Sequence, residues 1–368
     1  MKQDSSKITK QIIYGIFIFF LGVLLVYSVS YKMPKVIEET VTKVEKEVTV
    51  TDVGIADAVE KVYDSVVVIN TYKDGRVYSG GSGFIYKVDG EESYIITNHH
   101  VVSGGEEYKI IYTDTKEAEA KLLGSDEYAD IAVLKVKTKE NYKEVEIGKS
   151  DEMRVGDTAF TVGAPLDNTY SWTVTRGILS GKDRLVEVSL QQGNQSDYIM
   201  NVMQTDSAVN SGNSGGPLCN SNGEVVGVIN AKISSTGVEG IGFAIPIEIG
   251  LEKAERIISG DKSTYPYLGI SMLNVSSAIS YPQYNKMINE SKQTEGVIVL
   301  DVEKESAAEK SGIKINDIII GINNEKIENI AYLRYELYKY RVGDTIKVKV
   351  IREGEEKIID VKLSDNKK

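Results

Sequence analysis

The sequence predicts a mostly β protein: a large domain of β-barrel or β-sandwich type and a small α+β domain, preceded by one transmembrane helix. Three observations support this prediction. An uncharged apolar run fills residues 12–29, and many short strand-like runs follow it. After about residue 265, strand patterns are interspersed with helix patterns.

The first element is "IIYGIFIFFLGVLLVYSV", which is long enough to cross a bilayer as a helix. Residues 1–11 carry three lysines and one acid, and this positive excess favours a cytoplasmic N-terminus. A cleaved signal peptide is the alternative, because Ser28 and Ser30 offer a small-x-small site, but the run is longer than a usual signal core. We therefore expect a single-pass anchor at residues 12–29 in the cell membrane, with the rest of the chain extracytoplasmic.

Residues 30–52 are rich in Lys, Glu, Val and Thr, which predicts an exposed stalk. The main domain is expected at residues 53–260, opening with a short amphipathic helix in "IADAVEKVYDS" and ending in a helix at residues 246–259. The runs between them are rich in β-branched and aromatic residues and are separated by Gly, Asn and Asp, as in barrels and sandwiches. The predicted strands are "VVVINTY", "GSGFIYKV", "SYIITN", "EYKIIYT", "IAVLKV", "TAFTVG", "EVVGVINA" and "IGFAIPI".

Residues 261–368 form the predicted α+β domain, whose first strands are "YLGISML" and "EGVIVLDV". A short helix in "AAEKSG" ends at Gly312, which serves as its C-cap. A strand, a helix and two strands are then predicted at "DIIIGIN", "AYLRYELYKY", "DTIKVKVIR" and "KIIDVKL".

Charge and cysteine content exclude several classes of function. The formal net charge is -11 and no basic patch is visible, so nucleic-acid binding is not expected. Cys219 is the only cysteine, so the chain forms no internal disulfide, and it is expected to be a small buried apolar residue. Two adjacent histidines and one distant cysteine do not have metal-ligand spacing, so we expect no metal and no cofactor.

Three segments together carry the residues of a nucleophilic enzyme. A serine hydroxyl, Ser214 in "GNSGG", needs a base to remove its proton, and the imidazole of His100 has a suitable pKa range. The imidazole in turn needs a carboxylate to orient it, and Asp130 stands at the start of an apolar strand. The backbone N–H groups of Gly212, Asn213 and Ser214 are candidates for the oxyanion hole.

Chain order separates two enzyme architectures. Residues 212–216 also match G-x-S-x-G, the nucleophile elbow of α/β-hydrolases, but that fold places a histidine after the serine and none follows Ser214 here. The order His, Asp, Ser is that of chymotrypsin-like β-barrels.

Several motifs together resemble the HtrA/Deg family of trypsin-like serine proteases, over about residues 55–260. Residues after 265 resemble a PDZ domain, through "YLGI" and "SAAEKSGIKINDIIIGINNEKI". The resemblance implies a chymotrypsin-like double β-barrel followed by a PDZ domain, and assembly into homo-oligomers, as trimers or multiples of them. The protease motifs are "GSGFIY", "TNHHVV", "DIAVLKV", "VGAPL", "TRGILSG", "TDSAVNSGNSGGPL", "GEVVGVINA" and "GIGFAIP".

The family pattern T-N-x-H-V falls on His100, which leaves His99 at a variable, solvent-exposed position. Adjacent side chains of an extended stretch point to opposite sides, so only one of the two histidines is expected to face Ser214. Asp130 matches the family's acid, whereas Asp126 is expected to cap a turn.

The resemblance also indicates binding sites. The specificity pocket wall is expected around Ile229 and Asn230; no acid lies there, which predicts cleavage after small or medium apolar residues such as Val, Ala or Leu. The N–H groups of Leu268, Gly269 and Ile270 are expected to bind the C-terminal carboxylate of a peptide.

We therefore predict an ATP-independent serine endopeptidase that degrades misfolded or damaged exported proteins in quality control and the stress response. One alternative is a chaperone or tethering protein that binds unfolded clients through the PDZ domain. Another is a signalling protease with one dedicated substrate.

Overall fold

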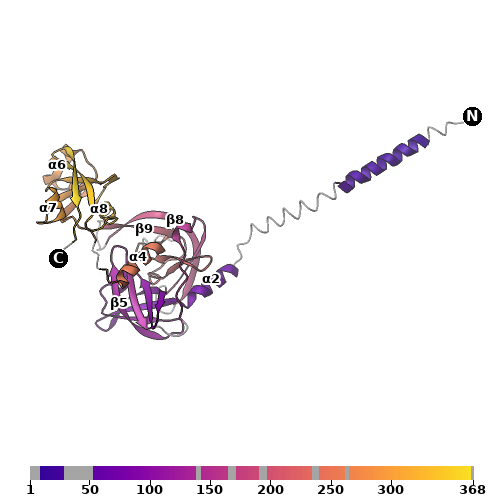
Figure 1. Cartoon of the computed structure of the whole chain (residues 1–368), viewed down its shortest axis with the longest axis horizontal. Coiled ribbons are helices and arrows are strands. Elements are labelled where there is room, and N and C mark those ends of the chain that lie inside the picture. Colours follow the sequence, from indigo (N-terminus) through magenta and orange to yellow (C-terminus); the bar gives the residue numbers. More distant parts are fainter. Residues whose placement is uncertain are drawn as a thin grey trace, which may run out of the picture. The chain divides into compact units, whose positions relative to one another are not determined.

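The computed structural model describes residues 9–28, 53–137, 142–164, 171–189, 197–233, 240–261 and 265–365 (Figure 1). The predicted stalk at residues 30–52 and most of the predicted N-terminal tail lie outside these ranges. Residues 1–54 and 55–368 form two separate units.

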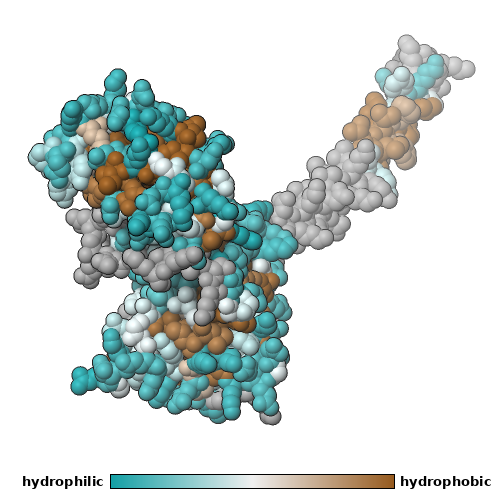
Figure 2. Space-filling view, turned by 60° about the vertical axis from the view of Figure 1, so that its left-hand side comes forward, coloured by the Kyte–Doolittle hydropathy of each residue, from teal (hydrophilic) through white to brown (hydrophobic). Residues whose placement is uncertain are grey.

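The N-terminal unit contains one apolar helix, Thr9–Ser28, with a mean hydropathy of 2.1. By length and composition this helix is able to cross a membrane, which is compatible with a single-pass anchor. Figure 2 shows its surface as a continuous hydrophobic band.

The larger part of the second unit consists of two closed antiparallel barrels of six strands each. The strand order is β1-β2-β3-β6-β5-β4 in the first barrel and β10-β11-β12-β9-β8-β7 in the second. The first barrel contains β1 Val66–Lys73, β2 Arg76–Asp89, β3 Glu92–Thr97, β4 Glu107–Ile111, β5 Glu117–Asp126 and β6 Ile131–Lys137. The second contains β7 Thr158–Gly163, β8 Thr173–Val188, β9 Tyr198–Thr205, β10 Pro217–Asn220, β11 Val225–Ile229 and β12 Gly242–Pro246.

Each barrel closes around its own apolar side chains, and a third cluster lies between the barrels and the flanking helices. In the first barrel the core includes Ile69, Ile95 and Leu134, all fully buried, and in the second it includes Leu179 and Leu218. The helices α2 (Val53–Tyr63) and α4 (Ile247–Ile258) contribute to the third cluster, together with β-strand residues from both barrels. The two barrels therefore share a packed junction, and segments at that junction are held rigidly.

Two short helical segments lie between strands of the barrels: α3 (His99–Val102) follows β3, and η1 (Ser150–Glu152) precedes β7. The first of these was not predicted, because "NHHVV" has too few residues to display a helical apolar period.

The C-terminal domain is a sheet of order β13-β14-β15-β17-β18, with β16 paired to β15, and β13 lies at its edge. The predicted helix at "AAEKSG" forms, and Gly312 follows it with a φ of 83°, a left-handed conformation that glycine adopts without cost. The elements are β13 Ile270–Asn274, α5 Val275–Ala278, η3 Pro282–Tyr284, α6 Asn285–Ser291, β14 Val297–Val302, α7 Ala307–Ser311, β15 Ile318–Ile322, β16 Glu325–Lys326, α8 Ile330–Leu337, β17 Thr345–Arg352 and β18 Glu355–Lys362. The predicted fold class is thus confirmed for both domains.

One buried ion pair holds β17 against the turn before β15. Arg352 Nε and Nη2 each donate to one carboxylate oxygen of Asp317, both at 2.7 Å, and the Lys314 N–H donates to the same carboxylate at 2.8 Å. The Asp317 side chain is fully buried, so its charge depends on these donors.

Replacing Arg352 with leucine should lower the free energy of unfolding by about 3 kcal/mol or more, because it leaves a buried carboxylate without its partner charge. Denaturant unfolding followed by circular dichroism measures the loss. Lys347→Ala is the control, since it removes an exposed pair with Asp360 on the neighbouring strands and should cost less than about 1 kcal/mol. Equal losses in the two variants would contradict this account.

Candidate active site

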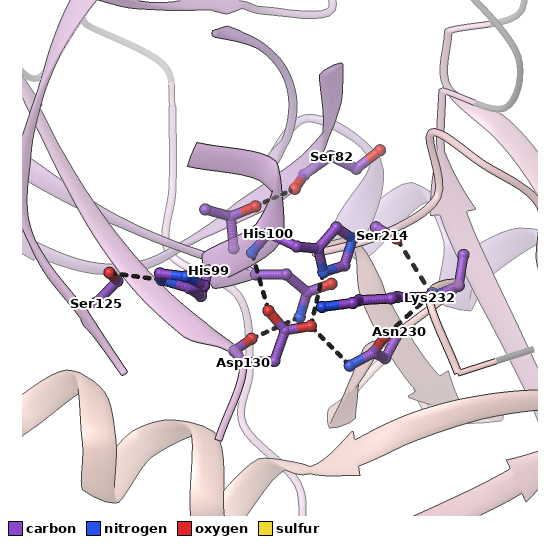
Figure 3. Close-up of polar contacts among 11 residues, drawn as sticks. Ser82, His99, His100, Ser125, Asp130, Ser214, Asn230 and Lys232 are labelled. Carbon is purple, nitrogen blue, oxygen red and sulfur yellow. Dashed lines mark hydrogen bonds and ion pairs between the residues drawn. The ribbon is translucent and has the colours of Figure 1, made fainter. Parts of the chain in front are cut away.

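The structure brings His100 and Asp130 into direct contact. His100 Nδ1 lies 2.6 Å from Asp130 Oδ2, and because a carboxylate only accepts, this nitrogen carries the proton (Figure 3). The backbone N–H of His100 donates to the other oxygen, Oδ1, at 2.9 Å. In the neutral imidazole this contact leaves Nε2 as the nitrogen without a proton, directed away from the acid, as a general base requires.

The local chain explains this geometry. His100 lies in the single turn α3, directly after β3, and the side chain of Asn98 in front of it donates to the Asp130 carbonyl at 2.9 Å. Asp130 precedes β6 with a φ of 51°, in the left-handed region that Asp tolerates better than most residues. Only 2% of Asp130 is exposed, so its carboxylate interacts with protein donors rather than with bulk water.

Ser214 lies in the turn between β9 and β10, opposite β2 of the first barrel. Its carbonyl accepts from the Ser82 N–H at 2.8 Å, and the Ser82 hydroxyl donates to the Gly212 carbonyl at 2.8 Å. Two hydrogen bonds thus tie the serine turn to the opposite barrel. Within the described part of the chain, Ser214 Oγ accepts a hydrogen bond from the Ala231 N–H at 3.2 Å and forms none with His100, although Figure 3 shows the imidazole between Asp130 and Ser214.

The predicted oxyanion donors differ in availability. The Asn213 N–H donates to the Asn210 carbonyl at 3.0 Å, so it is already used within the turn. Among the described residues, the Gly212 and Ser214 N–H groups have no acceptor, and Gly212 has a φ of 99° that glycine permits. The prediction that included Asn213 is therefore wrong on this point, because the sequence does not reveal which N–H closes the turn.

His99 has a different environment from the one expected. It lies on the same helical turn as His100, not on an extended stretch, and its Nδ1 contacts the Ser125 hydroxyl at 2.8 Å. Burial lowers the pKa of this imidazole, which favours its neutral form. A polar hollow of about 360 Å³ adjoins both histidines and is lined by Tyr78, Ser79, His99, His100, Ser103, Glu127 and Lys232.

Asp126, the rival acid, caps the turn that leads to Asp130. Its Oδ1 accepts from the N–H groups of Tyr128 and Ala129 at 3.1 and 2.9 Å. The Tyr265 hydroxyl also contacts the Asp126 carboxylate, at 2.7 Å for Oδ2. Turn capping was the role expected for Asp126, and none of these contacts involves the imidazole of His100.

The two residues predicted to form the wall of the specificity pocket have buried side chains with defined contacts. Ile229 is fully buried and packs in the core of the second barrel, with Leu218 and Met203. Asn230 directs its side-chain amide to Asp130 Oδ2, at 2.8 Å. The pocket wall expected around these two residues stays a prediction, and the pattern "VINA" did not reveal these side-chain contacts.

The C-terminal domain places Leu268, Gly269 and Ile270 where the chain enters the edge strand β13. The Leu268 and Gly269 carbonyls accept from Ala308 and Glu303 N–H groups, both at 2.9 Å. Gly269 has a φ of 77°, and a Cβ on it would approach the Ser306 Cβ to 2.2 Å. Only glycine fits at position 269. The Leu268 and Gly269 carbonyls of this loop are turned into the domain.

Within the described ranges, no group of three or more His, Cys, Asp or Glu side chains is placed to hold a metal ion. Cys219 is fully buried, and burial raises the pKa of its thiol well above the usual range.

Comparison with known proteins agrees with this fold. A model of the trypsin-like peptidase domain matches residues 81–228, and a model of the PDZ domain matches residues 266–363. "Serine protease Do-like HtrB" of Bacillus subtilis is 37% identical over 327 residues, covering 84% of this chain and 71% of that protein. The chain belongs to the HtrA family of serine proteases.

Other HtrA proteins match at similar levels. "Serine protease Do-like HtrA" of B. subtilis is 42% identical over 77% of this chain, and the chain spans 63% of that relative's length. The counterpart of Lactococcus lactis is 34% identical over 84% of this chain and 82% of its own length.

Among solved structures, the HtrA-type protease AlgW with a decapeptide superimposes with a TM-score of 0.65 at 26% identity, covering 85% of this chain and 99% of that one. The serine endoprotease from Yersinia pestis gives a TM-score of 0.63 at 28% identity, covering 85% and 98%.

Substituting Gly215 with alanine should reduce peptidase kcat on the order of 100-fold, because a misplaced nucleophile loses its alignment. Gly215 has a φ of 83°, and a Cβ there would lie 2.2 Å from Thr97 Oγ1 and 2.3 Å from the Ser82 carbonyl. Gly75→Ala is the matched control, since its φ is 71° but nothing lies within 4 Å of the added Cβ. Steady-state kinetics of the two variants test this, and a similar loss in both would refute it.

Proposed function

We propose that this HtrA-family chain is a membrane-anchored, ATP-independent endopeptidase that degrades misfolded or damaged exported proteins. The observation that carries the proposal is the buried Asp130 carboxylate bonded to His100 beside Ser214. That arrangement contains a nucleophile, a base and an orienting acid.

In the proposed reaction, His100 Nε2 removes the Ser214 proton and Oγ attacks the peptide carbonyl. Oγ reaches the imidazole by rotating away from the Ala231 N–H. The Gly212 and Ser214 N–H groups then stabilise the oxyanion, and the imidazolium gives its proton to the leaving amine as the peptide C–N bond breaks. Water, deprotonated by the same imidazole, then attacks the acyl group on Ser214 and releases it as a carboxylic acid, which regenerates the hydroxyl. Asp130 holds the imidazole in the required tautomer throughout and stabilises its positive charge.

The C-terminal domain is proposed to bind the C-terminal peptides of clients. The edge position of β13 allows a peptide to add as a further strand, and α8 lies along the same strand, with the Ile330 N–H bonded to Asn274 Oδ1 at 2.8 Å. With the carbonyls of Leu268 and Gly269 already accepting bonds, the N–H groups of this loop are proposed to receive the carboxylate.

The remaining proposals concern location and assembly. The helix Thr9–Ser28 supports an anchor in the cell membrane. The positive excess in residues 1–11 supports a cytoplasmic N-terminus, which would place both domains outside. Family membership supports a homo-oligomer, as trimers or multiples of them. We propose cleavage after small or medium apolar residues, which unfolding exposes in client proteins.

Ser214→Ala and His100→Ala should each lower kcat by roughly 10⁴-fold or more, because either change disables proton transfer to the nucleophile. His99→Ala is the control and should leave kcat nearly unchanged, since His99 contacts Ser125. A peptide panel scored by mass spectrometry gives kcat and the cleavage sites together. Strong preference for Lys or Arg would refute the specificity, and activity retained in Ser214→Ala would refute the mechanism.

The same Ser214→Ala protein, used to capture client proteins, distinguishes the quality-control protease from the two alternative functions. If it captures many unfolded exported proteins and the cell loses their degradation, the quality-control proposal stands. Retention of every cellular role by Ser214→Ala would instead favour the chaperone or tether, and capture of a single protein would favour the dedicated signalling protease.

Amidating the C-terminus of a bound peptide should weaken its affinity for the C-terminal domain by about tenfold or more, because it removes the charge from a charge-assisted hydrogen bond. Gly269→Ala should weaken binding comparably, given its clash with Ser306. Gly312→Ala is the control in the same domain, with a φ of 83° and no atom within 4 Å of the added Cβ. Calorimetric titration measures all three, and equal affinity for acid and amide would contradict the proposed carboxylate loop.

A further inference from the structure

The side chain of Asn230 is buried at the centre of the candidate active site, with 1% of the residue exposed. It follows β11, in the second barrel, yet its amide reaches Asp130 of the first barrel: Nδ2 lies 2.8 Å from Oδ2 (Figure 3). The next residue donates its N–H to Ser214 Oγ. Two consecutive residues of one segment thus contact the acid and the nucleophile.

We propose that Asn230 is a positioning residue for peptide hydrolysis, which fixes the Asp130 carboxylate so that the carboxylate can orient His100. This inference rests on the proposed function of Ser214, His100 and Asp130. It assigns Asn230 a role in kcat and no role in substrate selection.

The hydrogen bonds of Asp130 show why a donor from the second barrel matters. Among the described residues, three N–H groups reach its carboxylate, and two of them belong to His100 itself. Those two bonds move with His100, so they do not fix the acid and the imidazole relative to the second barrel. Of these three bonds, only that of the Asn230 amide comes from the barrel that carries Ser214. It therefore fixes Asp130 and His100 in position relative to the nucleophile.

The amide of Asn230 is itself held in one orientation. Its backbone N–H donates to the Phe243 carbonyl at 2.9 Å, and its Oδ1 accepts from the Lys232 N–H at 3.2 Å. With the oxygen occupied by a donor, the nitrogen is left to face Asp130. The flipped amide would place an oxygen against a carboxylate and leave two acceptors without a proton between them.

The chemistry of an amide suits this position. Asn donates a hydrogen bond to the anion without adding a positive charge, so it does not compete with the imidazolium that forms during proton transfer. Nδ1 of His100 and Nδ2 of Asn230 share the same oxygen, at 2.6 and 2.8 Å. A carboxylate oxygen has two lone pairs, and these two donors use both.

The test compares two nearly isosteric variants in the full chain, assayed on one peptide substrate. Asn230→Leu removes the donor, and kcat should fall about tenfold or more with KM changed by less than about twofold. Asn230→Asp places a second carboxylate against the first, and kcat should fall further at pH 8. The ranking of substrates across a peptide panel should be unchanged in both.

Asn220→Leu is the matched control. Asn220 Nδ2 donates to the Glu224 carboxylate at 2.7 Å in the same barrel, and its Oδ1 also accepts from two backbone N–H groups. The control should therefore lose at least as much thermal stability as Asn230→Leu while keeping kcat. Proton NMR adds a measurement that does not depend on the stability of the fold. The downfield resonance of the His100 Nδ1–H should shift in Asn230→Leu and not in Asn220→Leu.

The inference is overturned if kcat in Asn230→Leu equals that of the control, or if the loss lies in KM or in substrate ranking. Should Asn230→Leu fail to fold, Asn230→Ala takes its place with the same criteria. The proposed function fails separately, if wild-type chain shows no peptidase activity that Ser214→Ala removes.

Discussion

The active site depends on one buried negative charge, the carboxylate of Asp130. A carboxylate with 2% of its residue exposed is costly unless donors surround it, and donors that surround it also fix its direction. Those donors come from α3 and from the segment after β11, which belong to different barrels. Satisfying one charge therefore fixes the position of the base relative to the barrel that carries the nucleophile.

The junction between the barrels supplies the other constraint, through Ser82. This residue donates two hydrogen bonds to the serine turn: its N–H donates to the Ser214 carbonyl and its hydroxyl to the Gly212 carbonyl. The same hydroxyl accepts a hydrogen bond from the Ala164 N–H, which follows β7. A single residue of β2 thus holds two carbonyls of the turn, one through its backbone N–H and one through its hydroxyl. These bonds hold the turn in one conformation, in which the Gly212 and Ser214 N–H groups have no acceptor among the described residues and are available to an oxyanion.

Much of this could be predicted from the sequence, and the limits have physical causes. Chain order and residue chemistry indicated a His, Asp, Ser enzyme, and the resemblance to the HtrA/Deg family pattern selected His100 over His99 and Asp130 over Asp126. The argument from an extended stretch was wrong, because α3 is helical, but successive helical residues also diverge, by about 100°, so His99 still faces Ser125. The surroundings of Ile229 and Asn230 depend on partners far along the chain, and no local pattern records them. The Asn213 N–H is bonded within its own turn, to Asn210, but the sequence does not reveal which N–H of a glycine-rich turn closes it.

The hydrogen bond between Ser214 Oγ and the Ala231 N–H is consistent with a competent enzyme. At 3.2 Å between neutral groups it is a weak bond, worth about 1 kcal/mol, so rotating the hydroxyl toward His100 costs little. Catalytic hydrogen bonds are often long before substrate arrives and tighten in the complex. Since His100 and Asp130 are already aligned, the hydroxyl is the one member of the three that has to turn, and a single side-chain torsion is sufficient for that movement.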